Sequence, residues 1–244
     1  MRNGKTAEQI NQELKKVQEE WYNQLPEKFK DREKFSHPFF WGVSEKAWNE
    51  EKPLIMYMGE EARNWTFKDK KDIQKYAIDY LERQVYGASI CKKNRSPFWT
   101  FIRKLNFKEE YNICWNNLDK LHRVVKATTK PLTYGVEKEL HEILCDGKSL
   151  LVREIEIVKP DFVIFMGKAY NKSMAWAMGE NYKVKDLNSY KPSSENFYVS
   201  EVKEIPESVR GSVQKMIWMY HPRYIQGQGA RVAAIEKIQN ILKR

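Results

Sequence analysis

Three short apolar runs in this sequence each lead directly into side chains that can move protons or read a planar ligand. They are PLIMYM (53–58), followed by Gly59, Glu60 and Glu61; YNICWN (111–116), followed by Asn117; and KMIWMY (215–220), followed by His221. A carboxylate can position water, a carboxamide offers both a donor and an acceptor, and an imidazole can stabilise a departing anion. Brought together at one cleft, these side chains would activate water, read a planar amide edge and stabilise a leaving group.

The three runs have the length and composition of buried strands. A fourth strand is expected at DFVIFMG (161–167), and FYVSEV (197–202) could add an edge strand. Helices are expected at 72–86, 97–105, 136–144, 149–158, 168–178 and 229–243. Strands that alternate with helices predict a central, largely parallel sheet that binds ligands at the carboxyl ends of its strands. The three polar strand ends should therefore meet at one edge of the sheet.

The beginning of the chain has a different pattern. Residues 6–25 carry apolar side chains at helical spacing, which predicts an amphipathic helix, and an irregular basic and aromatic segment follows it. We expect residues 1–48 to form an N-terminal helical extension packed on an α/β domain of residues 49–244. The polar stretch at 183–212 should be a long excursion before the last strand.

The charge balance favours a polyanionic partner. Among 244 residues there are 43 Lys and Arg against 33 Asp and Glu, a net charge of +10. Nucleic acid is the first candidate, although a basic, well-solvated surface would give the same composition. No run of 18 apolar residues and no signal-like start is found, so we expect no membrane partner and a cytoplasmic location. The widely spaced Cys91, Cys114 and Cys145 predict reduced, mostly buried thiols and no metal site.

At these motifs the sequence resembles the uracil-DNA glycosylase superfamily, over roughly residues 50–226. Four segments carry the resemblance in the family's order: MYMGEEA, ICWNNLDK, LLVREIEIVKPDFVIFMGKAY and MIWMYHPRY. The resemblance implies a three-layer α/β/α sandwich with a central, mostly parallel four-stranded sheet. It also implies a monomeric enzyme that binds DNA, flips a base out of the stack and hydrolyses its N-glycosidic bond, with no metal or redox cofactor.

The resemblance assigns catalysis to three residues. Glu60 or Glu61, in the first loop, would position water or stabilise the sugar cation, and His221 would contact the base carbonyl. Cleavage of an N-glycosidic bond builds positive charge on the sugar and negative charge on the departing base. A carboxylate would stabilise the positive charge on the sugar, and a histidine donor would stabilise the negative charge on the base.

The resemblance also assigns residues to the base and to the DNA. Asn117 would pair with the flipped base, within an Asn-x-x-Lys pattern that Lys120 completes, and Phe98 would stack on it. In the first loop, Gly59 and Arg63 are also assigned to substrate contacts. In the last loop, Arg223 would bind a phosphate, and Tyr224 or Ile225 would be the wedge that fills the space the flipped base leaves in the duplex.

Plainer interpretations exist for each of these residues. Glu60 and Glu61 could open a helix, Asn117 could be a turn residue, and Phe98 could belong to the core. Lys120 and Arg123 would serve the basic surface, and His122 and His141 would be structural or surface residues.

Two other functions compete with the glycosylase hypothesis. The first is a non-catalytic nucleic-acid-binding protein of the same fold, because Ala62 stands where the family has proline. The second is an unrelated α/β hydrolase or transferase that acts on a small phosphorylated substrate. No Gly-rich phosphate loop is present to support the second.

Overall fold

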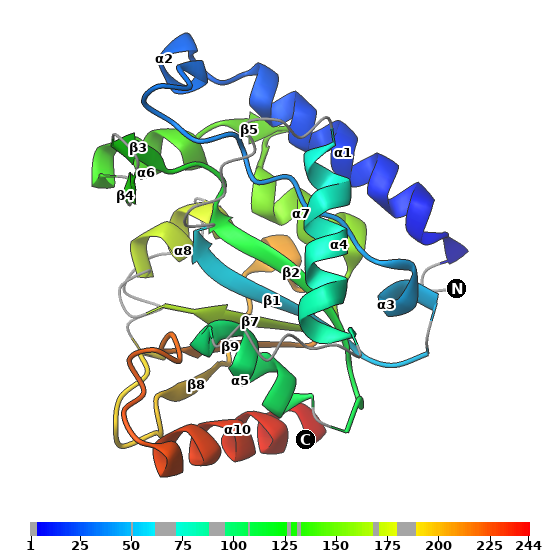
Figure 1. Ribbon diagram of the computed structural model, residues 1–244, viewed down its shortest axis with the longest axis vertical. Helices are drawn as coiled ribbons and strands as arrows, with labels where there is room; N and C mark the ends of the chain where they lie inside the picture. The colour runs from blue at the N-terminus through cyan, green and yellow to red at the C-terminus, as the bar shows by residue number, and fades with distance from the viewer. Residues whose placement is uncertain are drawn as a thin grey trace.

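A computed structural model describes residues 4–49, 51–61, 72–87, 96–106, 108–125, 128–130, 133–167, 171–179 and 189–244. At its centre lies a five-stranded sheet in the order β2–β1–β7–β9–β8 (Figure 1). The strands are β1 (Leu54–Glu61), β2 (Asn112–Asp119), β7 (Phe162–Met166), β8 (Val199–Val202) and β9 (Lys215–Met219). Four of them run parallel, and β8 pairs antiparallel with β9. The expected four-stranded sheet is therefore corrected to five strands, because the segment at 197–202 does form an edge strand.

Helices cover both faces of this sheet. They are α1 (Ala7–Asn23), α2 (Glu27–Lys30), α3 (Glu45–Asn49), α4 (Ile73–Val85), α5 (Pro97–Leu105), α6 (Tyr134–His141), α7 (Leu150–Val158), α8 (Asn171–Met178) and α10 (Gln228–Lys243). In Figure 1, α4, α5 and α10 lie on one face, and α7 and α8 lie on the other, with α1 packed on α7. The fold is thus a mixed α/β arrangement with a mostly parallel sheet, compatible with a three-layer α/β/α sandwich.

The central strands are apolar on both faces because both faces are covered. Residues 54–58 of β1 and 163–164 of β7 are fully buried. A strand buried on both sides reads as a continuous apolar run and not as an alternation, which is the pattern that identified these strands in the sequence. The register places the carboxyl ends of β1, β2 and β9 at one edge of the sheet, as expected.

The N-terminal segment shares a core with the sheet. Helix α1 begins with a capping box in which the Thr6 hydroxyl accepts from the Gln9 amide and the Gln9 side chain accepts from the Thr6 amide. On the apolar face of α1, Ile10 and Leu14 belong to the same buried cluster as β1 and β2, whereas Val17 and Trp21 belong to a second cluster. The chain then returns along α1, where the Asn11 carboxamide exchanges two hydrogen bonds with the backbone of Val43 at 2.9 and 2.8 Å.

Short elements connect the main ones. They are a hairpin of β3 (Arg123–Val125) and β4 (Thr128–Lys130), a hairpin of β5 (Leu144–Cys145) and β6 (Lys148–Ser149), and the 3₁₀ helix η2 (Glu207–Val209). The helix expected at 136–144 ends earlier, at His141, because Leu144 and Cys145 pair with Ser149 and Lys148. The polar stretch at 183–212 contains β8 and η2 among its described residues.

Two observations bear on the expectations from composition. Within the described residues, no helix is long and apolar enough to cross a membrane. Cys114 and Cys145 are both buried, and Cys91 lies outside the described residues. Burial raises the pKa of the Cys145 thiol to about 12.

Candidate functional site

The paired ends of β1 and β2 form the base of the candidate site. The parallel register sets Tyr57 opposite Trp115 and Gly59 opposite Asn117. Because side chains alternate between the two faces of a strand, Trp115 and Asn117 share one face. Helices α4 and α5 cover this face, since the ring centroids of Tyr80 and Trp99 lie 5.8 and 4.9 Å from that of Trp115. This face therefore carries two aromatic rings followed by a carboxamide.

Strand β1 continues further than its sequence pattern indicates. Gly59 was expected to end the strand, yet pairing extends to the partner residues Glu61 and Asp119. Glu60 and Glu61 are therefore strand residues, neither loop residues nor the opening of a helix. Their side chains, and the whole of Arg63 and Ala62, lie outside the described part of the chain.

A close approach explains the glycine at position 59. A Cβ atom there would lie 2.5 Å from Asn117 Oδ1 and 3.3 Å from Phe98 Cε2. Real Cβ atoms do not approach an oxygen to 2.5 Å, so only glycine lets the carboxamide and the ring pack against the strand. Gly59, Phe98 and Asn117, which the sequence assigned to one site, are therefore brought together.

Phe98 is both a core residue and a site residue. It is the second residue of α5, and its side chain is 9% exposed. Its ring centroid lies 4.6 Å from that of Tyr57 and 6.4 Å from that of Trp115. The Tyr57 hydroxyl donates to the Phe98 carbonyl at 3.1 Å, which fixes the start of α5 over β1. Burial raises the pKa of Tyr57 well above its ordinary value, so its phenol remains a hydrogen-bond donor.

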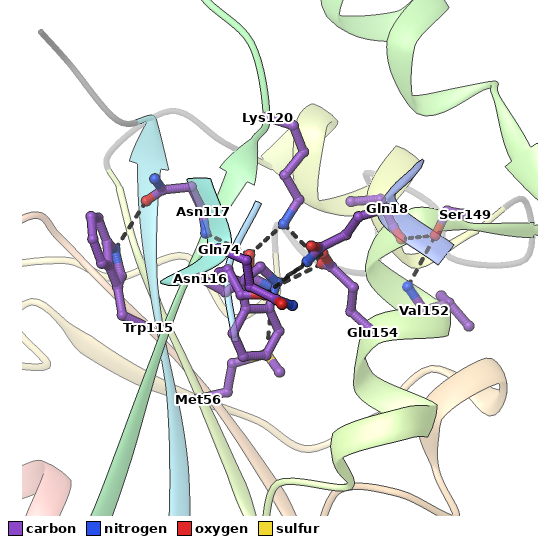
Figure 2. Close-up of polar contacts among 12 residues, drawn as sticks. Gln18, Met56, Gln74, Trp115, Asn116, Asn117, Lys120, Ser149, Val152 and Glu154 are labelled. Carbon is purple, nitrogen blue, oxygen red and sulfur yellow. Dashed lines mark hydrogen bonds and ion pairs between the residues drawn. The ribbon is translucent and has the colours of Figure 1, made fainter. Parts of the chain in front are cut away.

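The orientation of the Asn117 carboxamide is determined by Trp115. The indole Nε1–H of Trp115 donates to Asn117 Oδ1 at 3.2 Å (Figure 2). An indole can only donate, so the atom facing it must be the amide oxygen. The amide nitrogen Nδ2 is buried and has no hydrogen-bond partner among the described residues. A buried donor left without an acceptor costs about 1–3 kcal/mol.

His221 reaches the same site from the loop after β9. Its ring is half-buried and lies 6.1 Å from the Phe98 ring at an interplanar angle of 24°. His221 Nδ1 accepts from the backbone N–H of Arg223 at 3.1 Å. In a neutral imidazole the proton then resides on Nε2, which makes Nε2 the donor.

The last loop corrects one assignment. Ile225 is fully buried in the main core, so it is not available as a surface wedge. Tyr224 is 47% exposed, with its ring 6.1 Å from that of His221, and Arg223 is exposed. Of the two wedge candidates, only Tyr224 presents its side chain to solvent.

Lys120 is a second correction, because it is buried and not part of the basic surface. Its Nζ donates to Asn116 Oδ1 and, at 2.8 Å, to Glu154 Oε2 (Figure 2). Glu154, on α7, is fully buried. Burial lowers the pKa of Lys120, and the neighbouring carboxylate of Glu154 opposes this effect. Sequence reasoning missed Glu154 and Trp115; a glutamate inside the apolar stretch LLVREIEIV was the only available signal for the first.

Two histidines near the site are structural. His122 is 2% exposed, neither ring nitrogen has a hydrogen-bond partner among the described residues, and burial lowers its pKa to about 4. His141 Nε2 lies 3.2 Å from Asp119 Oδ1 and ties α6 to the end of β2.

Neither a cluster of possible metal ligands nor a similarity to known proteins assigns a function to this site. Within the described ranges, no three His, Cys, Asp or Glu side chains are grouped so that they could hold a metal ion. No protein-family model matches the sequence, and no curated protein matches it.

Proposed function

We propose that this protein is a DNA glycosylase-like enzyme, similar to the uracil-DNA glycosylase superfamily, which accepts a flipped base and hydrolyses its N-glycosidic bond. One observation carries the proposal: the buried amide nitrogen of Asn117 has no hydrogen-bond partner in the described structure, in a carboxamide that packs against Phe98 and Gly59. A carbonyl oxygen on the edge of a base would accept this hydrogen bond and remove the cost of the orphaned donor.

The surrounding side chains suit a planar base. The Phe98 ring offers an aromatic face, and stacking on such a face contributes about 1–3 kcal/mol per base. Asn117 Oδ1, already bound to the Trp115 indole, retains a second lone pair, so the carboxamide can still accept from a ring N–H. The donor at Nδ2 and the remaining lone pair at Oδ1 together match the amide edge of a base.

The neutral tautomer of His221, with its proton on Nε2, suits a donor to the leaving group. As the C1′–N bond breaks, its electron pair moves to the base. Water then adds to C1′ of the sugar cation and releases a proton, so that the net products are the C1′ hydroxyl and the protonated, neutral base. The Nε2–H of His221 can donate to the base oxygen on which negative charge develops, since Nδ1 is engaged by the Arg223 amide. Glu60 or Glu61 would supply the carboxylate that orients the water.

Charge and exposure support DNA as the substrate. The net charge of +10 favours a polyanion, and Arg223 and Tyr224 are exposed beside His221. A guanidinium can hold a phosphate next to the flipped nucleotide, and an exposed phenol ring can fill the space that the base leaves.

The test is excision from oligonucleotides that each carry one uracil, hypoxanthine or other modified base, as single and double strands, scored as alkali-sensitive sites on a gel. We expect abasic sites with at least one base. Asn117→Ala should abolish them, whereas Asn112→Ala, at the opposite end of the same strand, should retain activity.

The same experiment separates the non-catalytic alternative. Salt-dependent binding of the oligonucleotides without any abasic site, at an excess of protein over DNA, would refute the enzyme and favour a protein that binds DNA only. No binding and no excision would refute both.

A further inference from the structure

A buried polar network lies on the face of β2 opposite the candidate site. Its centre is the fully buried carboxylate of Glu154, which accepts four hydrogen bonds (Figure 2). Lys120 Nζ and Asn116 Nδ2 donate to Oε2 at 2.8 and 2.9 Å. Trp41 Nε1 and Gln18 Nε2 donate to Oε1 at 2.8 and 3.0 Å. Because an ionised carboxylate offers about four lone-pair positions, this group is fully satisfied.

Asn116 connects this network to the site. Its Nδ2 is committed to the carboxylate, so its Oδ1 faces the Lys120 ammonium and also accepts the backbone N–H of Asn117 at 2.7 Å. The Asn116 carboxamide cannot flip without setting an NH₂ group against an ammonium and an N–H. The backbone at Asn117 is therefore held by a side chain that Glu154 and Lys120 orient.

The donors on the far side of Glu154 come from the N-terminal segment. Gln18 lies on α1, and Trp41 lies in the irregular segment that returns along it. Lys120 is also covered by this segment: its Nζ lies 5.9 Å from the Phe39 ring, and its carbonyl accepts the Phe39 N–H at 2.7 Å. Buried charges are costly unless every partner is in place, so loss of one donor should disturb the whole network.

We propose that Glu154, Lys120 and Asn116 are positioning residues for Asn117, and that the N-terminal segment completes the base site by holding Glu154 through Gln18 and Trp41. That this site binds a base rests on the proposed function, whereas the positioning of Asn117 does not. The network connects α1, through Glu154 on α7, to the carboxamide of Asn117, whose buried donor has no partner among the described residues.

The test reads the site directly, by ¹⁵N–¹H correlation spectra of the full chain. The sequence has eight tryptophans, and the indole signal of Trp115 reports its hydrogen bond to Asn117 Oδ1. Trp115→Phe and Asn117→Ala assign the Trp115 indole and the Asn117 carboxamide signals. We expect Glu154→Gln and Trp41→Phe to shift both signals.

Trp48→Phe is the matched control. Trp48 is also a buried indole of the N-terminal segment, and its Nε1 donates to the Lys5 carbonyl at 2.7 Å, away from Glu154. Trp48→Phe should leave the Trp115 and Asn117 signals unchanged. Unchanged signals in Trp41→Phe and Glu154→Gln, or equal shifts in Trp48→Phe, would overturn the proposal.

Two further measurements separate positioning from folding and from catalysis. If Glu154→Gln is poorly folded, the double variant Lys120→Met/Glu154→Gln should regain stability because no unpaired charge remains, while the Asn117 signal stays displaced. On a substrate that the wild type excises, Trp41→Phe should lower excision about 10- to 100-fold relative to Trp48→Phe, as expected for a misplaced site residue. If the wild type excises nothing, the proposed function fails, and the spectra still decide the positioning.

Discussion

The close packing at Gly59 gives a sharp test of the site, through the substitution Gly59→Ala. The added methyl group would lie 2.5 Å from Asn117 Oδ1, and real Cβ atoms keep at least 3.0 Å. The oxygen must therefore retreat by about 0.5 Å or more in a close-packed interior. The 3.2 Å hydrogen bond from Trp115 opposes this movement of the Asn117 oxygen. The new methyl group cannot move towards Phe98 instead, because Phe98 Cε2 would already lie 3.3 Å from it.

The size of the effect follows from this crowding. Overpacking of a buried position costs about 1–3 kcal/mol. For a chain of this length each kcal/mol corresponds to about 2–4 °C in the melting temperature, so Gly59→Ala should melt about 2–12 °C below the wild type. A reacting group displaced by about 1 Å costs about 100-fold in rate, so excision should fall far more than the loss of stability explains.

The control is Gly229→Ala, in the first turn of α10, where nothing lies within 4 Å of an added Cβ atom. Alanine is the better helix former, so this variant should melt no lower than the wild type. Melting curves and excision assays at a temperature where both variants are folded provide the comparison. If Gly59→Ala melts and excises like Gly229→Ala, the carboxamide does not lie where the site requires it, and the reasoning is refuted.

Three further predictions concern other parts of the chain. Burial holds the pKa of His122 at about 4, below its ordinary 6.5, so protonation favours the unfolded chain. The contribution of neutral His122 to the free energy of unfolding should be fully present above pH 6.5, and about 3 kcal/mol of it should be lost towards pH 4. Urea denaturation at each pH should show this dependence, and His122→Phe should remove it. Tyr224→Ala should weaken excision from double strands more than from single strands, whereas Val232→Ala, at a similarly exposed position on α10, should leave excision from both substrates unchanged. Position 61 shares the strand face of position 59, so Glu61→Gln should reduce excision about 100-fold and Glu60→Gln much less; equal losses would contradict this assignment.

The sequence predicted the sheet well because buried parallel strands leave a direct pattern. The runs at 53–58 and 215–220 are apolar on both faces, and each ends in a polar or glycine residue at the edge where parallel strands place ligands. The meeting of Asn117 with Gly59 then follows from parallel pairing alone. The prediction at Gly59 was wrong only about the length of β1. Gly59 was expected to end the strand, yet a residue without a side chain permits the pairing to continue beside Asn117.

The residues that sequence reasoning placed wrongly depend on contacts between distant segments. Lys120 stands in the basic stretch KLHRVVK, and nothing within that stretch indicates that a glutamate on α7 and the N-terminal segment will enclose it. Ile225 lies in a polar loop, but its side chain fills the main core. Burial of this kind is set by tertiary packing, which neither periodicity nor composition encodes.

Two unfavourable features of this structure fall on consecutive residues of β2. Asn117 leaves a buried amide donor without an acceptor in the described structure on one face of β2, and Asn116 faces a buried ion pair on the other. A chain selected only for stability would satisfy the donor, and it would gain by replacing the ion pair with apolar residues of similar volume. Proteins retain such costs where function requires fixed polar groups. Two of them on consecutive residues near the carboxyl end of β2, where parallel sheets generally place ligands, are therefore stronger support for a site at Asn117 than either is alone.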